Sequence, residues 1–177
     1  IILMKYLVKF IVVTFFLLVS TSAFAEQKIV VLDLKYVLNN SKAGKGAQDF
    51  LKKTFENNAK KFADMEKKLK KEESDLLSKK TVLSKEEYTK KGDALRKQVI
   101  DYQSQRRSSL DKIATQRAKS REKLIEAIDP ILNAYIKENN IYLVMDKKDF
   151  LGGTPESDIT EIIIKKLNKE LPSLNLK

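Results

Sequence analysis

The side chains that most often carry out chemistry in proteins are missing from this sequence. Among its 177 residues there is no His, no Cys and no Trp. Without Cys the chain has no disulfide, thiolate metal site or cysteine nucleophile, and without His it lacks the commonest metal ligand and neutral-pH acid–base group. No nucleophile–base pair can be assembled, and no motif supports a Ser–Lys dyad. We therefore predict that the protein is not an enzyme and that it uses no metal or other cofactor.

Two short patterns resemble ligand sites but have simpler explanations. The run Gly44-Lys45-Gly46 lacks the G-x-x-x-x-G-K-[ST] spacing of a phosphate-binding loop, so we interpret it as the loose start of a helix. Asp33 and Asp146 end two apolar runs, and two carboxylates without further ligands are weak support for a metal site. Turn chemistry at the ends of strands accounts for both aspartates better.

Basic residues are the remaining chemical feature, and they are concentrated in one segment. Residues 51–123 hold 22 Lys and Arg against 12 Asp and Glu, a net charge of +10, whereas residues 26–50 and 124–177 together carry −1. A segment of one sign attracts anionic partners, although charge runs are often only solvated faces. The candidate contacts to such a partner are Lys60, Lys61, Lys67, Lys68, Lys79, Lys80, Lys90, Lys91, Arg96, Arg106 and Arg107.

Residues 1–25 have the pattern of a secretory signal peptide. Lys5 and Lys9 precede an apolar run at residues 10–19, and an Ala-Phe-Ala run at residues 23–25 fits the small-x-small cleavage pattern. A membrane-spanning helix is the rival interpretation, but it needs roughly 20 apolar residues and would have to include both lysines. We expect cleavage after the Ala-Phe-Ala run and a mature chain outside the cytoplasm, where nucleic acid is not an expected partner.

The segments that would position the cations are two strands and a long helical region. The β-branched, apolar runs at residues 28–34 and 141–146 predict short buried strands that pair or share a sheet. Residues 47–129 contain one Gly and no Pro, which is typical of long helices. Apolar residues in the first part of this region fall at heptad spacing, namely Phe55, Phe62, Leu69, Leu76 and Leu83. The companion heptad column turns polar along the chain, so the seam is thin and suits one partner helix.

A capping-box pattern predicts that the helical region folds back on itself. Ser84 and Glu87 have the S-x-x-E form that starts a helix, and a second stripe with Tyr88, Leu95 and Tyr102 follows. We therefore predict an antiparallel hairpin with its tip near residues 78–84, in preference to a single unbroken helix. The aromatic residues are interpreted as seam residues first, and as stacking platforms for bases only second.

The predicted head surrounds the two strands. Pro130 should kink the second helix or remove one of its hydrogen bonds, and a last helix is expected over about residues 159–170. Two short strands leave unpaired edges and a small head offers little core, so we predict that the head is shared in a homo-oligomer. The residues expected in this core are Ile29, Val31, Ile128, Leu132, Leu143, Ile162 and Ile163.

The predicted fold class is α+β, with a long antiparallel, coiled-coil-like helical hairpin arm that projects from a small β-containing oligomerisation head. In this division residues 1–25 are the cleaved signal peptide, residues 26–46 and 124–177 form the head, and residues 47–123 form the basic arm.

Together these features resemble the Skp/OmpH family of periplasmic outer-membrane-protein chaperones. The resemblance covers the mature chain and is carried by Lys-Ile-Val-Val-Leu-Asp at 28–33, the basic hairpin, Tyr-Leu-Val-Met-Asp at 142–146 and Asp-Ile-Thr at 158–160. It implies a trimer with a β-barrel hub and three arms, which enclose unfolded outer-membrane proteins without ATP and keep them soluble until insertion. Lipopolysaccharide binding has also been proposed for the family, and the resemblance assigns no residue of this chain to it.

Two other functions are compatible with the sequence. A structural coiled-coil spacer of the cell envelope would be a stiff rod with no affinity for unfolded chains. A basic surface protein would bind lipopolysaccharide, an anionic membrane surface or nucleic acid, and its affinity for folded polyanions would fall steeply with salt.

Overall fold

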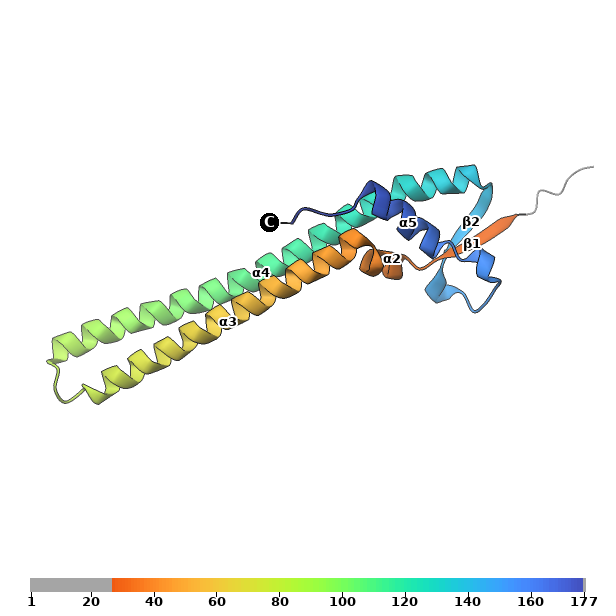
Figure 1. The fold of residues 1–177 in the computed structure, drawn as a ribbon. Coiled ribbons are helices and arrows are strands. Elements are labelled where there is room, and N and C mark those ends of the chain that lie inside the picture. The colour runs from red at the N-terminus through yellow and green to blue at the C-terminus, as the bar shows by residue number, and fades with distance from the viewer. Residues whose placement is uncertain (1–26, 177) are drawn as a thin grey trace, which may run out of the picture.

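The computed structural model describes residues 27–176, so the predicted signal peptide lies outside the described part of the chain. In chain order, the helices and strands are β1 (Lys28–Leu32), α2 (Leu34–Asn40), α3 (Lys42–Ser78), α4 (Lys85–Glu138), β2 (Ile141–Asp146) and α5 (Thr160–Glu170). Figure 1 shows a hairpin of α3 and α4 that projects from a small head, which confirms the predicted fold class. Within the described residues, no helix combines the length and the apolar composition that crossing a bilayer requires.

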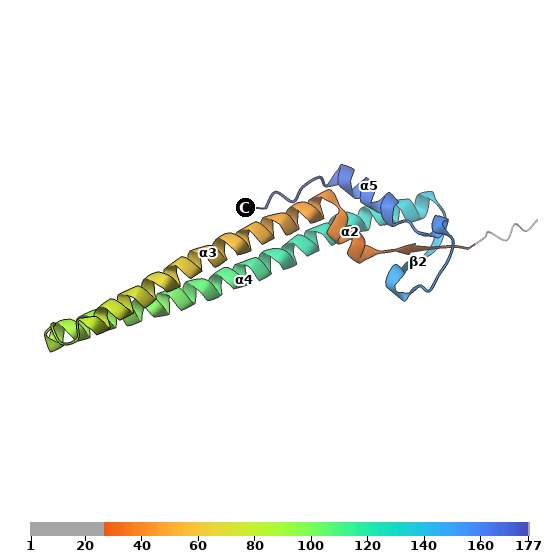
Figure 2. The ribbon, with the colours of Figure 1, turned by 60° about the horizontal axis from the view of Figure 1, so that its bottom comes forward.

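The hairpin turns where the sequence predicted. Residues 79–84 form the tip, between the end of α3 and the start of α4, and Figure 2 shows the two helices side by side as far as this tip. The Ser84 hydroxyl accepts a hydrogen bond from the Glu87 N–H at 3.2 Å, and the Glu87 carboxylate accepts one from the Ser84 N–H, also at 3.2 Å. The Ser84 hydroxyl also donates to the Glu87 carboxylate at 3.0 Å, and this hydrogen bond, aided by the one from the Ser84 N–H, holds the pKa of Glu87 below its ordinary value. The predicted capping box is therefore confirmed.

The seam between α3 and α4 departs from the predicted heptad. Phe62 is buried, but Phe55 is 51% exposed, so its predicted place in the seam is wrong. The buried and half-buried positions of α3 along the seam are 51, 54, 58, 62, 65, 69, 72 and 76. A straight helix drifts by about 20° per heptad, so a strict heptad column rotates out of the contact. Two successive four-residue steps, from 54 to 58 and from 58 to 62, return the contact face to the partner helix.

Both strand-end aspartates take part in turns, as predicted. The Asp33 carboxylate accepts a hydrogen bond from the Tyr36 N–H at 2.7 Å and so caps α2, a seven-residue helix that the sequence did not predict. The Asp146 carboxylate accepts one from the Lys148 N–H at 3.1 Å. This backbone hydrogen bond, aided by the Lys148 ammonium, holds the pKa of Asp146 below its ordinary value.

The start of α3 is tighter than the sequence suggested. α3 begins at Lys42, and the Ser41 hydroxyl accepts a hydrogen bond from the Gly44 N–H at 3.2 Å. Gly44 lies directly against the Leu38 carbonyl oxygen of α2, where a Cβ atom would overlap it. The interpretation of this glycine run as a loose helix start is therefore wrong, because Gly44 is packed at a helix–helix contact.

The head core lies between a two-stranded sheet and three helices. β1 and β2 pair in parallel, with Val30 beside Val144, and this confirms that the two apolar runs form one sheet. The buried cluster draws on β1, α2, the base of α4 and α5; its most enclosed members are Val30, Val37, Ile128, Ile159, Ile163 and Leu167. In α5 the buried neighbour of Ile163 is Ile164, whereas Ile162 is 39% exposed.

Pro130 lies inside α4, where it has no N–H to donate to the carbonyl group of Glu126. α4 nevertheless continues to Glu138, and Figure 1 shows it changing direction as it enters the head. The missing hydrogen bond and the bend are the effects that the sequence predicted for this proline.

Candidate functional site

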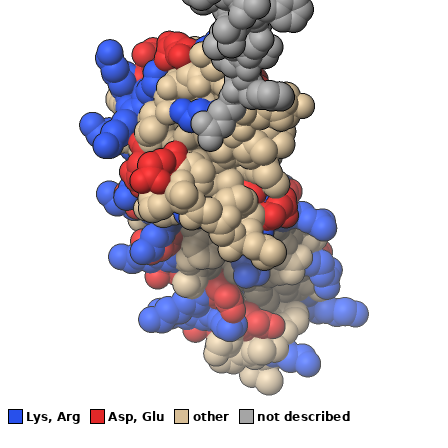
Figure 3. Space-filling view, turned by 90° about the vertical axis from the view of Figure 1, so that its right-hand side faces the viewer, with Lys and Arg blue, Asp and Glu red and all other residues tan. Residues whose placement is uncertain are grey.

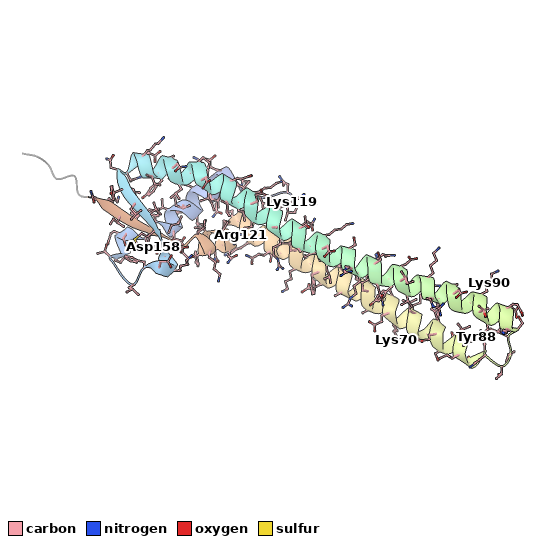
Figure 4. The ribbon with its side chains drawn as sticks, turned by 180° about the vertical axis from the view of Figure 1, so that it is seen from behind. Lys70, Tyr88, Lys90, Lys119, Arg121 and Asp158 are labelled. Atoms are coloured by element: carbon pink, nitrogen blue, oxygen red, sulfur yellow. The ribbon has the colours of Figure 1, made fainter. Side chains whose placement is uncertain are left out.

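Exposed cations extend along the whole arm, while the acidic and basic residues of the head nearly cancel. Figure 3 views the molecule from the head, where an uncharged area faces the viewer with both acidic and basic side chains around it. Figure 4 places Lys90 near the tip of the arm and Lys119 near its base, both on α4. The arm therefore presents a positive field that the head does not share.

All eleven cations predicted to contact a partner are exposed. Two of them pair with carboxylates one helical turn away, Lys68 with Glu72 at 3.7 Å and Arg96 with Asp93 at 3.1 Å. Within residues 27–176 the other nine form no ion pair: Lys60, Lys61, Lys67, Lys79, Lys80, Lys90, Lys91, Arg106 and Arg107. Most of the predicted set is thus available to an anionic partner.

Some of these cations meet at one hollow between α3 and α4, which we name the arm groove. It lies in the half of the arm nearer the head, it is open to solvent, and its volume is about 1010 Å³. Four cations line it, Lys61 from α3 and Arg107, Lys112 and Lys119 from α4. Lys112 and Lys119 are not among the cations predicted from the sequence, although their seven-residue spacing places them on the same flank of α4.

The remaining predicted cations are spread over the rest of the arm. Smaller hollows nearer the tip are lined by Lys79 and Lys91, by Arg96, and by Lys90. The cations that line none of the described hollows are Lys60, Lys67, Lys68, Lys80 and Arg106. The structure therefore does not gather the predicted set into a single site.

Polar and aromatic contacts cross the hairpin close to the arm groove. The Asn58 side-chain amide donates to the Ser109 hydroxyl at 2.8 Å, and the Phe62 and Tyr102 rings meet edge-to-face with centroids 6.0 Å apart. The Lys61 ammonium lies 5.6 Å from the centroid of the Phe62 ring, within the range of a cation–π contact. The hydrogen bond and the ring contact join α3 to α4, whereas the Lys61–Phe62 contact lies within α3.

Nearer the tip than the arm groove, opposite charges on α3 pair with each other. The Lys70 ammonium lies 2.8 Å from the Glu66 carboxylate, and the Tyr102 hydroxyl donates to the same carboxylate at 3.5 Å. The hydrogen bond and charge of Lys70 hold the pKa of Glu66 below its ordinary value, and Glu66 in turn raises the pKa of Lys70. Both groups stay charged and paired at neutral pH.

The head residues predicted as a shared core divide into two groups. Val31, Ile128 and Ile163 are buried, and Leu132 is half-buried. In contrast, Ile29, Leu143 and Ile162 are 46%, 45% and 39% exposed in the single chain. The last three therefore belong to the surface of one chain and not to its core.

The arrangement offers charge and shape for binding. Across residues 27–176, no group of three or more acidic or other ligand side chains is placed to hold a metal ion. The arm groove is open and has a basic rim, and its lining includes the buried side chains of Phe62 and Ile113. Such a surface can hold an anionic, partly apolar partner.

The comparisons with known proteins agree with this architecture. Residues 28–167 match the family described as outer membrane protein (OmpH-like). Over 166 residues the chain is 25% identical to a Skp-like protein of Pseudomonas aeruginosa, in an alignment that covers 94% of this chain and 99% of that protein. The crystal structure of an OmpH-like protein from Caulobacter crescentus is similar in fold, with a TM-score of 0.80 at 14% identity, over 89% of this chain and 94% of that one.

Proposed function

The chain belongs to the OmpH-like family of outer membrane proteins, and on that premise we propose that it is an ATP-independent holdase of the periplasm. In this proposal it captures unfolded outer-membrane proteins between basic helical arms and prevents their aggregation before they insert into the membrane. A protein of this family is not an enzyme. The name of the Skp-like relative in Pseudomonas aeruginosa supports a chaperone rather than a structural spacer.

The observation that carries the proposal is the separation of charge from the head. Residues 51–123 have a net charge of +10, nine of the eleven candidate cations form no ion pair within the described residues, and residues 26–50 and 124–177 together carry only −1. A protein made basic only for solubility would distribute its charge evenly. The positive arm attracts acidic unfolded chains over distances near the Debye length, about 8–10 Å at physiological salt.

Holding a client without nucleotide requires many weak contacts and does not require a single specific binding site. Individual exposed ion pairs contribute roughly 0–1 kcal/mol each, so a client is retained by their number and released when it gains a better partner. Exposed apolar side chains on the arm add further contacts, among them Phe55, Ile100 and Leu110, which are 51%, 59% and 48% exposed. The same arm can therefore hold clients of different sequence.

We further propose that the head joins several chains into a homo-oligomer, with a trimer as the number that the family resemblance implies. Ile29 and Leu143 are neighbours across β1 and β2, and both are about half exposed. β1 is occupied on both sides, by β2 and by a bridge from Val31 to Asp158, whereas β2 has no strand on its outer edge within the described residues. Covering this edge and its apolar side chains with further copies would remove an aggregation hazard.

The test is to dilute a urea-unfolded outer-membrane β-barrel protein into buffer with and without the mature chain, and to follow light scattering in the absence of nucleotide. We expect scattering to be suppressed at a few chains per client, and the suppression to weaken as salt is raised. Continued aggregation in the presence of the folded, helical protein would contradict the holdase and favour the envelope spacer. Suppression that salt does not weaken would remove the basic arm from the capture step.

A further inference from the structure

The arm groove differs from the other hollows of the arm in its charge. Its lining contains four cations and one carboxylate, that of Asp111. The three described hollows nearer the tip are balanced, with two basic and two acidic residues each. Within residues 27–176, none of the four groove cations forms an ion pair. The excess of positive charge is therefore local to this groove.

The groove exists because small polar side chains stand where a coiled coil would have large apolar ones. At the seam its walls carry hydroxyl and amide groups at Thr54, Asn58 and Ser109, and the hydrogen bond between Asn58 and Ser109 spans the two helices. Leucine at such positions would fill the space between the helices. Among the apolar residues that line the groove, Phe50 is half-buried and so keeps part of its ring accessible.

We propose that the arm groove is a binding subsite for an extended, acidic segment of an unfolded polypeptide. This inference rests on the proposed holdase function and names the part of the arm to which a client binds. The groove follows about 15 residues of α4, which corresponds to roughly 20 Å. An extended peptide advances about 3.3 Å per residue, so the groove accommodates about six residues.

Each part of the lining matches a part of such a segment. Lys61, Arg107 and Lys112 are placed to pair with client carboxylates, while the half-buried Phe50 offers apolar contact to a client side chain. The wall hydroxyl and amide groups can donate to and accept from the peptide backbone. A lipid acyl chain would gain nothing from these walls, since its burial favours continuous apolar surface. The chemistry therefore favours a peptide over a lipid.

The experiment measures binding of a fluorescein-labelled octapeptide of alternating Asp and Phe to the full mature chain by fluorescence anisotropy. The groove variant carries Lys61→Glu and Lys112→Glu. The matched control carries Lys71→Glu and Lys97→Glu, which make the same change in charge, with one lysine on each helix, at exposed positions outside the described hollows and outside the candidate contacts. We expect the groove variant to bind about five-fold or more weakly than wild type and the control less than about two-fold more weakly.

A second variant tests the shape of the groove without changing its charge. Ser108→Phe places an aromatic side chain in the groove and should block the peptide, while circular dichroism confirms that the helices remain formed. Equal losses in the groove and control charge variants, or full binding by Ser108→Phe, would overturn the subsite.

The holdase and the subsite can fail independently. If wild type suppresses client aggregation but the two charge variants bind the peptide equally, the subsite is wrong and the holdase stands. If the peptide binds in the groove but no client is held, the holdase is wrong and the subsite stands. Displacement of the labelled peptide by phosphatidylglycerol vesicles, but not by unlabelled unfolded client, would overturn the peptide assignment and give the groove to lipid headgroups.

Discussion

Gly44 controls how closely the arm can approach the helix that leads into it. It lies in the first turn of α3, against the Leu38 carbonyl oxygen near the end of α2. Its backbone conformation is ordinary, because no glycine in the described residues has a positive φ. The requirement for glycine here is therefore one of space, since only a residue without Cβ lets the two helices meet at this point.

Replacing Gly44 by Ala should lower the free energy of unfolding by about 1–3 kcal/mol, because the new Cβ atom must displace the α2 backbone. Gly46 on the same helix is the matched control, as no atom lies near the position of its Cβ. Gly46→Ala should raise stability by about 0.5–1 kcal/mol through helix propensity. Urea unfolding followed by circular dichroism checks both. Equal effects of the two substitutions would show that the α2–α3 contact does not constrain the arm.

At the scale of elements, the arm is a helical pair with an incomplete apolar seam. Aromatic contact between Phe62 and Tyr102 alternates with polar contact between Asn58 and Ser109. Most seam positions beyond Phe62 are only half-buried, so packing between α3 and α4 weakens toward the tip. The hydrogen bonds that cap the helix ends therefore contribute much of the stability of the outer arm.

The Ser84 cap is the most specific of these signals. Ser84→Ala removes the acceptor for the Glu87 N–H and should cost about 1 kcal/mol, which corresponds to roughly five-fold faster amide exchange in the first turn of α4. Ser78→Ala is the control, because the Ser78 hydroxyl only donates to the Asp75 carbonyl oxygen within α3. Hydrogen exchange read by mass spectrometry measures both. Unchanged exchange in Ser84→Ala would mean that the hairpin turn is held by other contacts.

At the scale of the whole molecule, charge and apolar surface are divided between arm and head. The arm projects its cations into solvent, and the head presents exposed apolar side chains around an open strand edge. Such a division suits an assembly in which heads associate and arms surround a shared space. The proposed holdase depends on this assembly, because one arm alone encloses nothing.

Ile29→Asp combined with Leu143→Asp should dissociate the proposed homo-oligomer. Both side chains are about half exposed in one chain and would be covered in the assembly, where unpaired carboxylates cost several kcal/mol. We expect the dissociation constant to rise about a hundredfold or more, measured by size-exclusion chromatography with multi-angle light scattering. Ile100→Asp, at a 59% exposed position on the arm, is the control and should leave the mass unchanged. A monomeric wild-type chain would contradict association through the head.

Much of this fold could be predicted from the sequence because its signals are local. The absence of Pro and the single Gly over residues 47–129 favour helix whatever surrounds them. The capping box at Ser84 and the two β-branched runs likewise act through near neighbours in the chain. By contrast, α2 has only seven residues and depends on a cap from Asp33, so no periodicity marked it.

The sequence by itself determined the charge of the protein, its lack of His and Cys, and the order of its two strands and three longest helices, because these follow from composition and short-range propensity. Only the tertiary structure decided which side chains meet. It exposed Phe55, buried Ile164 in place of Ile162, and brought Lys61 together with Lys112 across the arm groove. The physical reason is that these placements depend on how far two helices rotate against each other, and small drifts over many turns are not encoded by any single local pattern.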